Sequence, residues 1–174
     1  MAYINAASSA DFVRVLVRVN DGTAPAVADF YATGAVTTAT LEVPALQDIT
    51  ITNTPSTFRW KQLDTASEKV VTSVSSNTIS GNLVLDPATF FGTDPSAENE
   101  ATGTATEEGI FGMSNKKTRV DVLIGLSGLS TGDRYVMATG YFSNVAPAVS
   151  ADSPVWVSPI GLEIDGNYVA GTMA

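Results

Sequence analysis

The feature that most constrains the fold is a strict alternation of residue types near the start of the chain. Between residues 13 and 19 every odd position is valine, and arginine or leucine fills the even positions. A period of two places the valines on one face of an extended strand. Asn20, Asp21 and Gly22 follow directly as turn formers. The pattern predicts a β-strand over Phe12–Val19 that presents a valine face to a core and Arg14 and Arg18 on the other face.

Extended segments of this kind recur along the chain and predict a mainly β protein. They cover residues 12–19, 37–53 with a break at Pro44, 57–63, 69–74, 79–85, 120–126, 135–144 and 155–164. Residues 80–82 and 130–133 are expected to form turns or a bulge, and residues 147–154 and 165–167 to be further breaks.

Helix signals are few. Asp86 as an N-cap, Pro87 in the first turn and Gly92 as a stop predict a short helix over Asp86–Phe91. A weaker signal covers Leu63–Val70, where Thr65 and Glu68 have capping-box spacing. The expected fold class is therefore an antiparallel β-sandwich or barrel with one or two short helices, in a single domain over residues 1–174.

Two absent residue types restrict the chemistry. The chain has no histidine and no cysteine, which excludes a Ser-His-Asp or Cys-His relay, nitrogen or sulfur zinc ligands, iron–sulfur clusters and disulfides. Asp11, Asp21 and Asp133 lack the spacing of a calcium loop and are interpreted as turn residues. We therefore expect no enzyme activity, no metal and no cofactor.

The charge and the N-terminus limit the partners. Eighteen Asp and Glu against nine Lys and Arg give a net charge of −9, which argues against tight nucleic-acid binding. The N-terminus lacks the pattern of a secretory signal, and no apolar run approaches the roughly 20 residues of a membrane span. We expect a chain made in the cytoplasm with no membrane partner.

Residues 94–108 form the most acidic segment, with five acids, no base and no large apolar side chain. This composition predicts a long mobile loop. The loop could stay solvated, become ordered against a partner subunit, or meet the basic cluster that follows it. The residues proposed for such contacts are Glu98, Glu100, Glu107, Glu108, Lys116, Lys117 and Arg119.

The aromatic residues allow a rival interpretation. Trp60, Trp156 and their neighbouring aromatics are assigned to the core or to an interface. A carbohydrate-binding module or adhesin would instead use them as a stacking face for sugars.

The C-terminal third resembles the closing region of siphophage and myophage tail tube proteins. The matching residues are Gly140 to Pro147, reading GYFSNVAP, then Asp152 and Pro154, and then the alternating strand Val155–Ile164 closed by Gly166. The resemblance covers about 45 residues well and is a pattern of structural residues, not a catalytic signature.

This resemblance implies a structural subunit of the virion tail that forms hexameric rings stacked into a tube. The inner sheets of six copies would form one barrel, and a long loop, either 94–108 or Pro44–Pro55, would reach the adjacent ring. Implied partners are further copies, tape measure and tail tip or terminator proteins, and double-stranded DNA as passing cargo. A capsid decoration or head–tail connector protein is the alternative in the same class.

An acidic bore would repel the DNA phosphates along its length. Acids on predicted strands are the candidates for lining such a bore, namely Glu42, Asp48 and Glu163.

Overall fold

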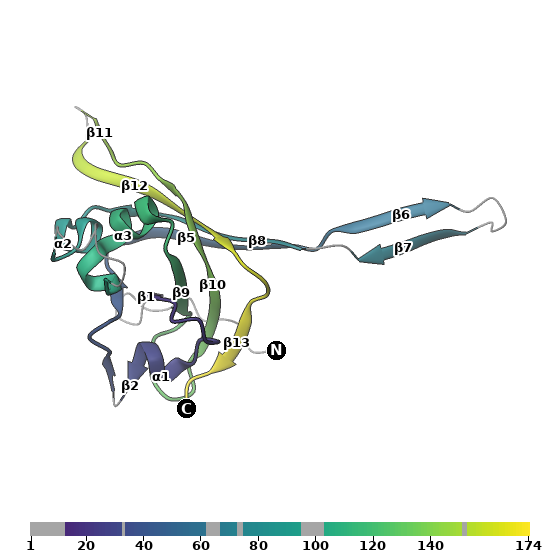
Figure 1. Cartoon of the computed structure of the whole chain (residues 1–174), viewed down its shortest axis with the longest axis horizontal. Coiled ribbons are helices and arrows are strands. Elements are labelled where there is room, and N and C mark those ends of the chain that lie inside the picture. Colours follow the sequence, from purple (N-terminus) through teal and green to yellow (C-terminus); the bar gives the residue numbers. More distant parts are fainter. Residues whose placement is uncertain (1–12, 33, 62–66, 73–74, 95–102, 151–152) are drawn as a thin grey trace.

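The computed structural model describes residues 13–32, 34–61, 67–72, 75–94, 103–150 and 153–174. Nine of the described strands build one antiparallel sheet with the strand order β4-β1-β9-β10-β12-β8-β5, in which β13 also pairs with β10 and β11 with β12 (Figure 1). Its strands are β1 (Arg14–Val19), β4 (Leu41–Val43), β5 (Leu46–Thr54), β8 (Ser76–Val84), β9 (Arg119–Gly125), β10 (Arg134–Val145), β11 (Ala148–Ser150), β12 (Ser153–Ile164) and β13 (Val169–Thr172). The prediction of a mainly β, antiparallel fold is confirmed.

The sheet curls until its two edge strands follow one another in the chain. β4 and β5 lie at opposite ends of the strand order, yet only Pro44 and Ala45 separate them. Ala45 has a φ of 54°, and proline has no N–H to continue the ladder. The predicted break at Pro44 is therefore the corner that brings both edges of the sheet together.

Two cores lie on opposite faces of β1 and β9. Val15 and Val17 point into the larger core, as the valine alternation predicted, whereas Leu16 is buried in the smaller one. The larger core also receives Leu83, Ile110 and Phe142 among others. The smaller core is closed by the helix α1 (Val27–Phe30) and the hairpin of β2 (Tyr31–Ala32) and β3 (Ala35–Val36).

Arg14 and Arg18 share the face of β1 opposite the valines, but neither needs a neighbouring subunit for a partner. Arg18 donates from Nε to the fully buried Asp121 at 3.1 Å and forms ion pairs with Asp21 and Asp29. Asn20 and Thr139 donate to the other oxygen of Asp121 at 2.7 and 2.6 Å. These hydrogen bonds and ion pairs hold the segment after β1 against the sheet.

The helix α2 (Pro87–Phe91) begins and ends as predicted. Asp86 accepts a hydrogen bond from the backbone N–H of Thr89 at 2.9 Å, and Gly92 follows with a φ of 78°. Its Phe90 is fully buried in the larger core.

The helix α3 (Ala105–Lys116) corrects the loop prediction for residues 94–108. Thr104 caps it, and the side chain of Glu107 accepts a hydrogen bond from the backbone N–H of Thr104 at 2.8 Å. Four residues assigned to the acidic loop are thus the first turn of a capped helix. Residues 95–102 of that loop lie outside the described residues.

Two other sequence predictions are wrong. Residues 80–82 continue β8 without a turn, and the register shift lies on the facing strand between Leu46 and Asp48. Gly81 is needed because a Cβ there would lie 2.5 Å from the carbonyl oxygen of Asp48. The weaker helix over Leu63–Val70 does not form at its described end, since β7 (Glu68–Thr72) begins there and pairs with β6 (Thr57–Lys61).

The hairpin of β6 and β7, here called the arm, projects from the far end of β5 and β8 (Figure 1). It forms a separate two-stranded sheet. No described residue of its two strands is buried.

Candidate functional site

The sheet of β5, β8 and β12 has one face turned away from the larger core. Along β8, Ile79, Gly81 and Leu83 are buried, while Ser80 between them is exposed. The facing residues on β5 and β12 follow the same alternation because the three strands are in register. The polar side chains on this outward face, here called the polar face, are Asp48, Thr50, Thr52, Thr78, Ser80, Asn82 and Glu163, and Val84, Val157 and Pro159 lie on the same side of the sheet.

Two predicted bore-lining acids come together on the polar face. Asp48 stands opposite Asn82, and Glu163 stands opposite Thr78 on the same strand β8. Both belong to a groove of about 660 Å³ that Ser143 and Asn144 of β10 extend. Asp48 is held in place by the backbone N–H and the side-chain amide of Asn82, at 2.9 and 2.8 Å.

The polar face carries negative charge and hydroxyl groups but no cation of its own. β5, β8 and β12 contain no lysine or arginine. Arg119 lies on β9, which β10 separates from β12, and its guanidinium donates to Asp165 at 2.9 Å. Such a surface repels phosphates and offers no long basic side chains to hold them.

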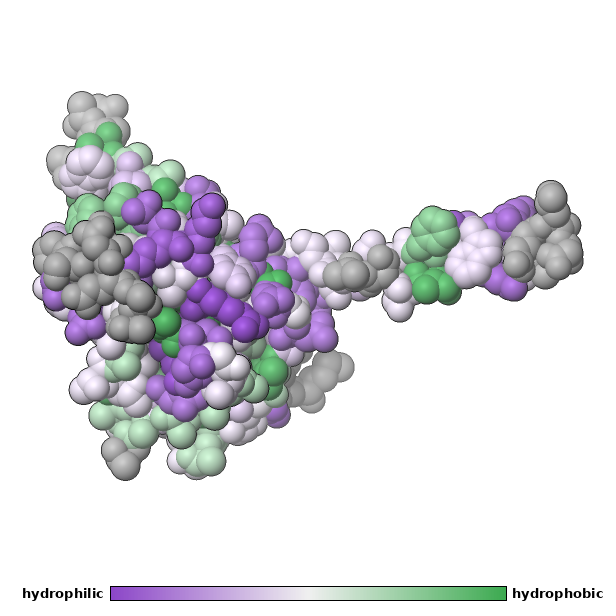
Figure 2. Space-filling model, viewed as in Figure 1, coloured by the Kyte–Doolittle hydropathy of each residue, from purple (hydrophilic) through white to green (hydrophobic). Residues whose placement is uncertain are grey.

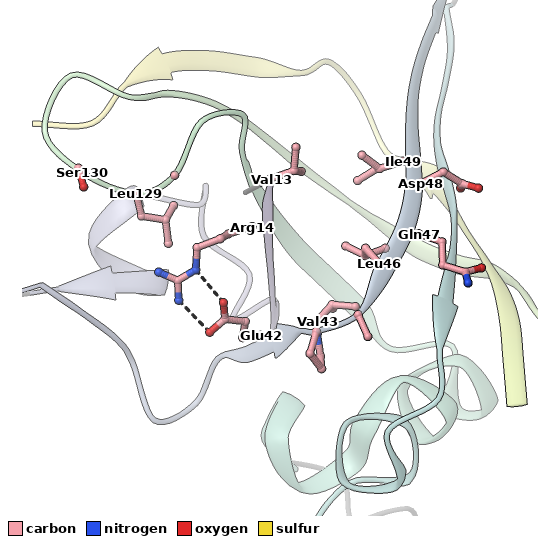
Figure 3. A pocket seen from close by; sticks show the side chains of 13 residues that line it. Val13, Arg14, Glu42, Val43, Leu46, Gln47, Asp48, Ile49, Leu129 and Ser130 are labelled. Atoms are coloured by element: carbon pink, nitrogen blue, oxygen red, sulfur yellow. Dashed lines mark hydrogen bonds and ion pairs between the residues drawn. The ribbon is translucent and has the colours of Figure 1, made fainter. Parts of the chain in front are cut away.

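The third predicted bore residue, Glu42, lies elsewhere. It accepts two hydrogen bonds from the guanidinium of Arg14 at 2.7 and 2.8 Å, and this pairing raises the pKa of Arg14 (Figure 3). The pair lines a cavity of about 820 Å³ between β1 and β5. Figure 3 shows Leu46 and Ile49 pointing into the cavity, while Asp48 lies on the other side of β5.

The residues proposed for contacts between subunits lie in different environments in the structure. Glu108 is buried and accepts a hydrogen bond from Lys116 of the same chain at 3.0 Å, while Glu107 caps α3. Hydrogen bonds from Thr104 lower the pKa of the Glu107 carboxyl. Lys117 is the left-handed C-cap of α3. Glu98 and Glu100 lie outside the described residues.

The arm carries exposed apolar residues that the sequence analysis assigned to a core or an interface. Phe58 is 63% exposed and stacks on Trp60 with 5.9 Å between ring centroids. Figure 2 shows hydrophobic residues on the arm, clear of the body. Because Trp156 is on β12, which begins on the opposite side of the molecule, the two tryptophans do not form one sugar-stacking face (Figure 1).

Both loops proposed to reach another ring are replaced by regular structure in their described parts. Residues 46–54 form β5 and residues 105–108 begin α3. The segment that projects lies between them in sequence. In the sequence this segment is visible as two alternating stretches on either side of residues 64–67. Their composition does not indicate that both stretches lie outside the core.

Two of the strand edges that lack a partner among the described residues border the polar face. β5 pairs with β8 on one side only. On β10, pairing with β9 ends at Tyr141, which leaves Phe142–Val145 without a strand on that side. Between these two edges lie the strands β5, β8 and β12 of the polar face and the end of β10 that extends its groove.

Within the described residues, no three acidic side chains gather as a metal site. No helix among them is long and apolar enough to cross a membrane.

No protein-family model and no curated protein matches this sequence. Solved structures do match. The tail of an empty gene transfer agent (GTA) particle, refined with C6 symmetry, aligns over 97% of this chain and 100% of its own, with a TM-score of 0.56 and 13% identity. The SPP1 tail tube aligns over 95% of this chain and 79% of its own, with a TM-score of 0.57 and 10% identity.

A third match is the cap that terminates the tube of the anti-feeding prophage. It covers 99% of this chain and 95% of its own, with a TM-score of 0.53 and 14% identity. At these identities the likeness is one of fold, and it extends over nearly the whole chain. The resemblance indicated by the C-terminal third therefore holds at the level of structure: this chain has the fold of the tail tube proteins of phage-like particles.

Proposed function

We propose that this chain is a non-enzymatic structural subunit of a phage-like tail tube, in which the polar face lines the channel. The observation that carries the proposal is a sheet face with acids and hydroxyls and without lysine or arginine on β5, β8 and β12. Double-stranded DNA would pass such a wall without being held, because attraction between lysine or arginine and phosphate dominates non-specific DNA binding.

The two unpaired strand edges support ring formation. If β5 of one copy pairs with Phe142–Val145 of the next, the polar faces join into one continuous sheet. Contacts between two different edges are heterologous and close into a ring when the rotation between copies closes. We propose six copies for each ring, as the C6 symmetry of the gene transfer agent tail suggests.

The remaining features of the proposed role follow from its place in the virion tail. Rings would stack through further copies of this chain, and the ends of the tube would meet tape measure, tail tip or terminator proteins. The arm is the segment best placed to reach beyond its own ring, because it projects from the body (Figure 1).

Electron microscopy of the concentrated protein tests assembly, and a gold label tests the orientation of the wall. The chain has no cysteine, so Ser80→Cys on the polar face gives a single attachment point. Asn115→Cys on the exposed side of α3 is the control, because α3 packs on the core side of the sheet.

Tubes with the Ser80→Cys label along the axis and the Asn115→Cys label on the outer wall are expected. A protein that stays monomeric at high concentration, or tubes with the Ser80→Cys label outside, would overturn the proposal.

A further inference from the structure

We propose that the arm of one copy docks on an aromatic and acidic surface formed by α2 and α3 of a second copy. The inference rests on the proposed function, since it names the surface that the arm would meet in the next ring. It is argued from three observations, which are the apolar face of the arm, an exposed aromatic pair on the helices, and their opposite charges.

The arm has one apolar face. Phe58 stands opposite Val71, and Trp60 stands opposite Lys69, so these four side chains share a face of the hairpin. The other face carries Arg59, which forms an ion pair with Glu68 at 3.5 Å. A two-stranded hairpin alone is marginally stable in water, and large exposed aromatics indicate a contact surface.

The helices α2 and α3 expose a second aromatic pair, Phe91 and Phe111. This pair and the acids Asp94 and Glu107 are here called the helix patch. Phe91 of α2 is 49% exposed and Phe111 of α3 is 37% exposed, with 5.8 Å between ring centroids. The buried Phe90 touches both rings, at 4.9 and 5.9 Å between centroids, and so holds them in place. A fixed aromatic pair lowers the entropy cost of docking.

The two acids lie close to this pair along the chain, since Asp94 is three residues after Phe91 and Glu107 is four residues before Phe111. The backbone N–H of Asp94 donates to the carbonyl of Glu107 at 3.3 Å, which brings the two segments together. Glu107 accepts hydrogen bonds from the backbone N–H and the hydroxyl of Thr104, both at 2.8 Å, and these contacts fix the position of its carboxylate.

The charges of the two surfaces are opposite. Residues 55–75 contain three of the nine Lys and Arg and two of the eighteen Asp and Glu, so this segment is +1 while the rest of the chain is −10. From Asp86 to Lys117 the described residues contain four acids and two lysines, a charge of −2, and within this set the buried Glu108 is paired with Lys116. Attraction between such surfaces favours the correct pairing and raises the association rate.

Within one chain the two surfaces cannot meet. β8 begins at Ser76 beside the arm and ends at Val84 just before α2, so a nine-residue strand of roughly 30 Å separates them (Figure 1). A contact between opposite ends of identical copies is heterologous, and it adds copies without limit when the rotation between copies does not close into a ring. This is the geometry that successive rings of a tube require.

Cysteine cross-linking tests the contact in the assembled protein. The double variant Val71→Cys/Phe111→Cys places one thiol on the arm and one on the helix patch, and a disulfide forms only when the two Cα atoms lie within about 7 Å. The matched control is Val71→Cys/Val169→Cys, because Val169 on β13 is equally exposed but is remote from α3.

After mild oxidation we expect a ladder of dimers, trimers and larger species on a non-reducing gel for the first variant, and at most dimers for the control. Tubes that form without this ladder would overturn the inference and leave the proposed function intact. A ladder from protein that forms no tube would overturn the proposed function and leave the inference intact. Absence of both would overturn both.

A charge reversal gives a second readout. Lys69→Glu should lower the yield of tubes by tenfold or more, and added salt should raise that yield because it screens the new repulsion. Arg134→Glu, the same change on the exposed start of β10, should leave the yield within twofold of the parent. Equal losses in both variants would contradict a role for Lys69 at the contact.

Discussion

The body and the arm of this molecule are built from the same kind of alternating sequence but use it differently. In the body, β1 is covered on both faces, with Val15 and Val17 in one core and Leu16 in the other. In the arm, Phe58 and Trp60 alternate equally well, yet no described residue of the hairpin is buried. The body therefore supplies its own stability, whereas the apolar face of the arm is available to a second copy.

Among the substitutions that compare the body with the arm, Phe90→Ala is expected to change the stability of the monomer most. Phe90 is fully buried between α2 and the larger core, so its removal should lower the free energy of unfolding of the monomer by about 3–5 kcal/mol. Denaturant unfolding followed by far-ultraviolet circular dichroism measures it. A loss below 1 kcal/mol would mean that α2 contributes little to the body.

Next in size is Asp121→Ala, which removes the acceptor shared by Arg18, Asn20 and Thr139. Leaving these donors buried without their partner should cost about 2–3 kcal/mol. Asp21→Ala is the control, since it removes an exposed ion pair with the same Arg18. If both variants show the same unfolding midpoint, the buried network does not stabilise the body.

Gly109→Ala should cost about 2 kcal/mol. Gly109 lies inside α3 with a φ of 66° and a ψ of 177°, a conformation that is essentially restricted to glycine. An added Cβ would also meet the backbone of Gly92 and lie 2.7 Å from the carbonyl oxygen of Phe90. Ser114→Ala in the same helix should be close to neutral. A fully stable Gly109→Ala would show that α2 and α3 can move apart freely.

A smaller effect is expected in the dependence of stability on pH. Hydrogen bonds from Thr23 lower the pKa of Asp21 to about 2. A carboxyl with a lowered pKa in the folded state stabilises the fold above its unfolded pKa and loses this contribution as the pH falls through the folded value. The midpoint of thermal unfolding should therefore fall between about pH 4 and pH 2, and less steeply in Asp21→Asn. Parallel curves for the two proteins would refute this assignment.

The smallest effect on monomer stability is expected from Phe58→Ala, the same substitution as in Phe90→Ala but on the arm. Because Phe58 lies outside both cores, the change should stay within about 0.5 kcal/mol. The same variant should reduce tube formation in the microscope. A destabilisation like that of Phe90→Ala would remove the distinction between the body and the arm.

Local signals in the sequence predicted several elements correctly because the causes are local. The alternation of valines gave β1, and Asp86, Pro87 and Gly92 gave both ends of α2. The capping box of Thr104 and Glu107 was equally local, but the density of acids and the lack of large apolar side chains over residues 94–108 favoured a loop interpretation. Packing of α3 against α2 and the core outweighs the weak helix propensity of these residues.

The candidate site was predictable only in part. Asp48 and Glu163 were chosen because they are acids on strands, and they share the polar face because β8 lies between their strands. Glu42 met the same criterion and is instead paired with Arg14. Nothing near Glu42 in the sequence states that β1 pairs with β4 in a register that places Arg14 within reach.

The sequence by itself determined where strands, turns and one helix form, and it excluded histidine and cysteine chemistry. Only the tertiary structure decided which alternating strands are covered and which are not. The reason is physical: a period of two separates the two faces of a strand, but burial of either face depends on the order and register of strands that are distant in the chain. The exposed aromatics of the arm and the cation-free face of the sheet both follow from that order.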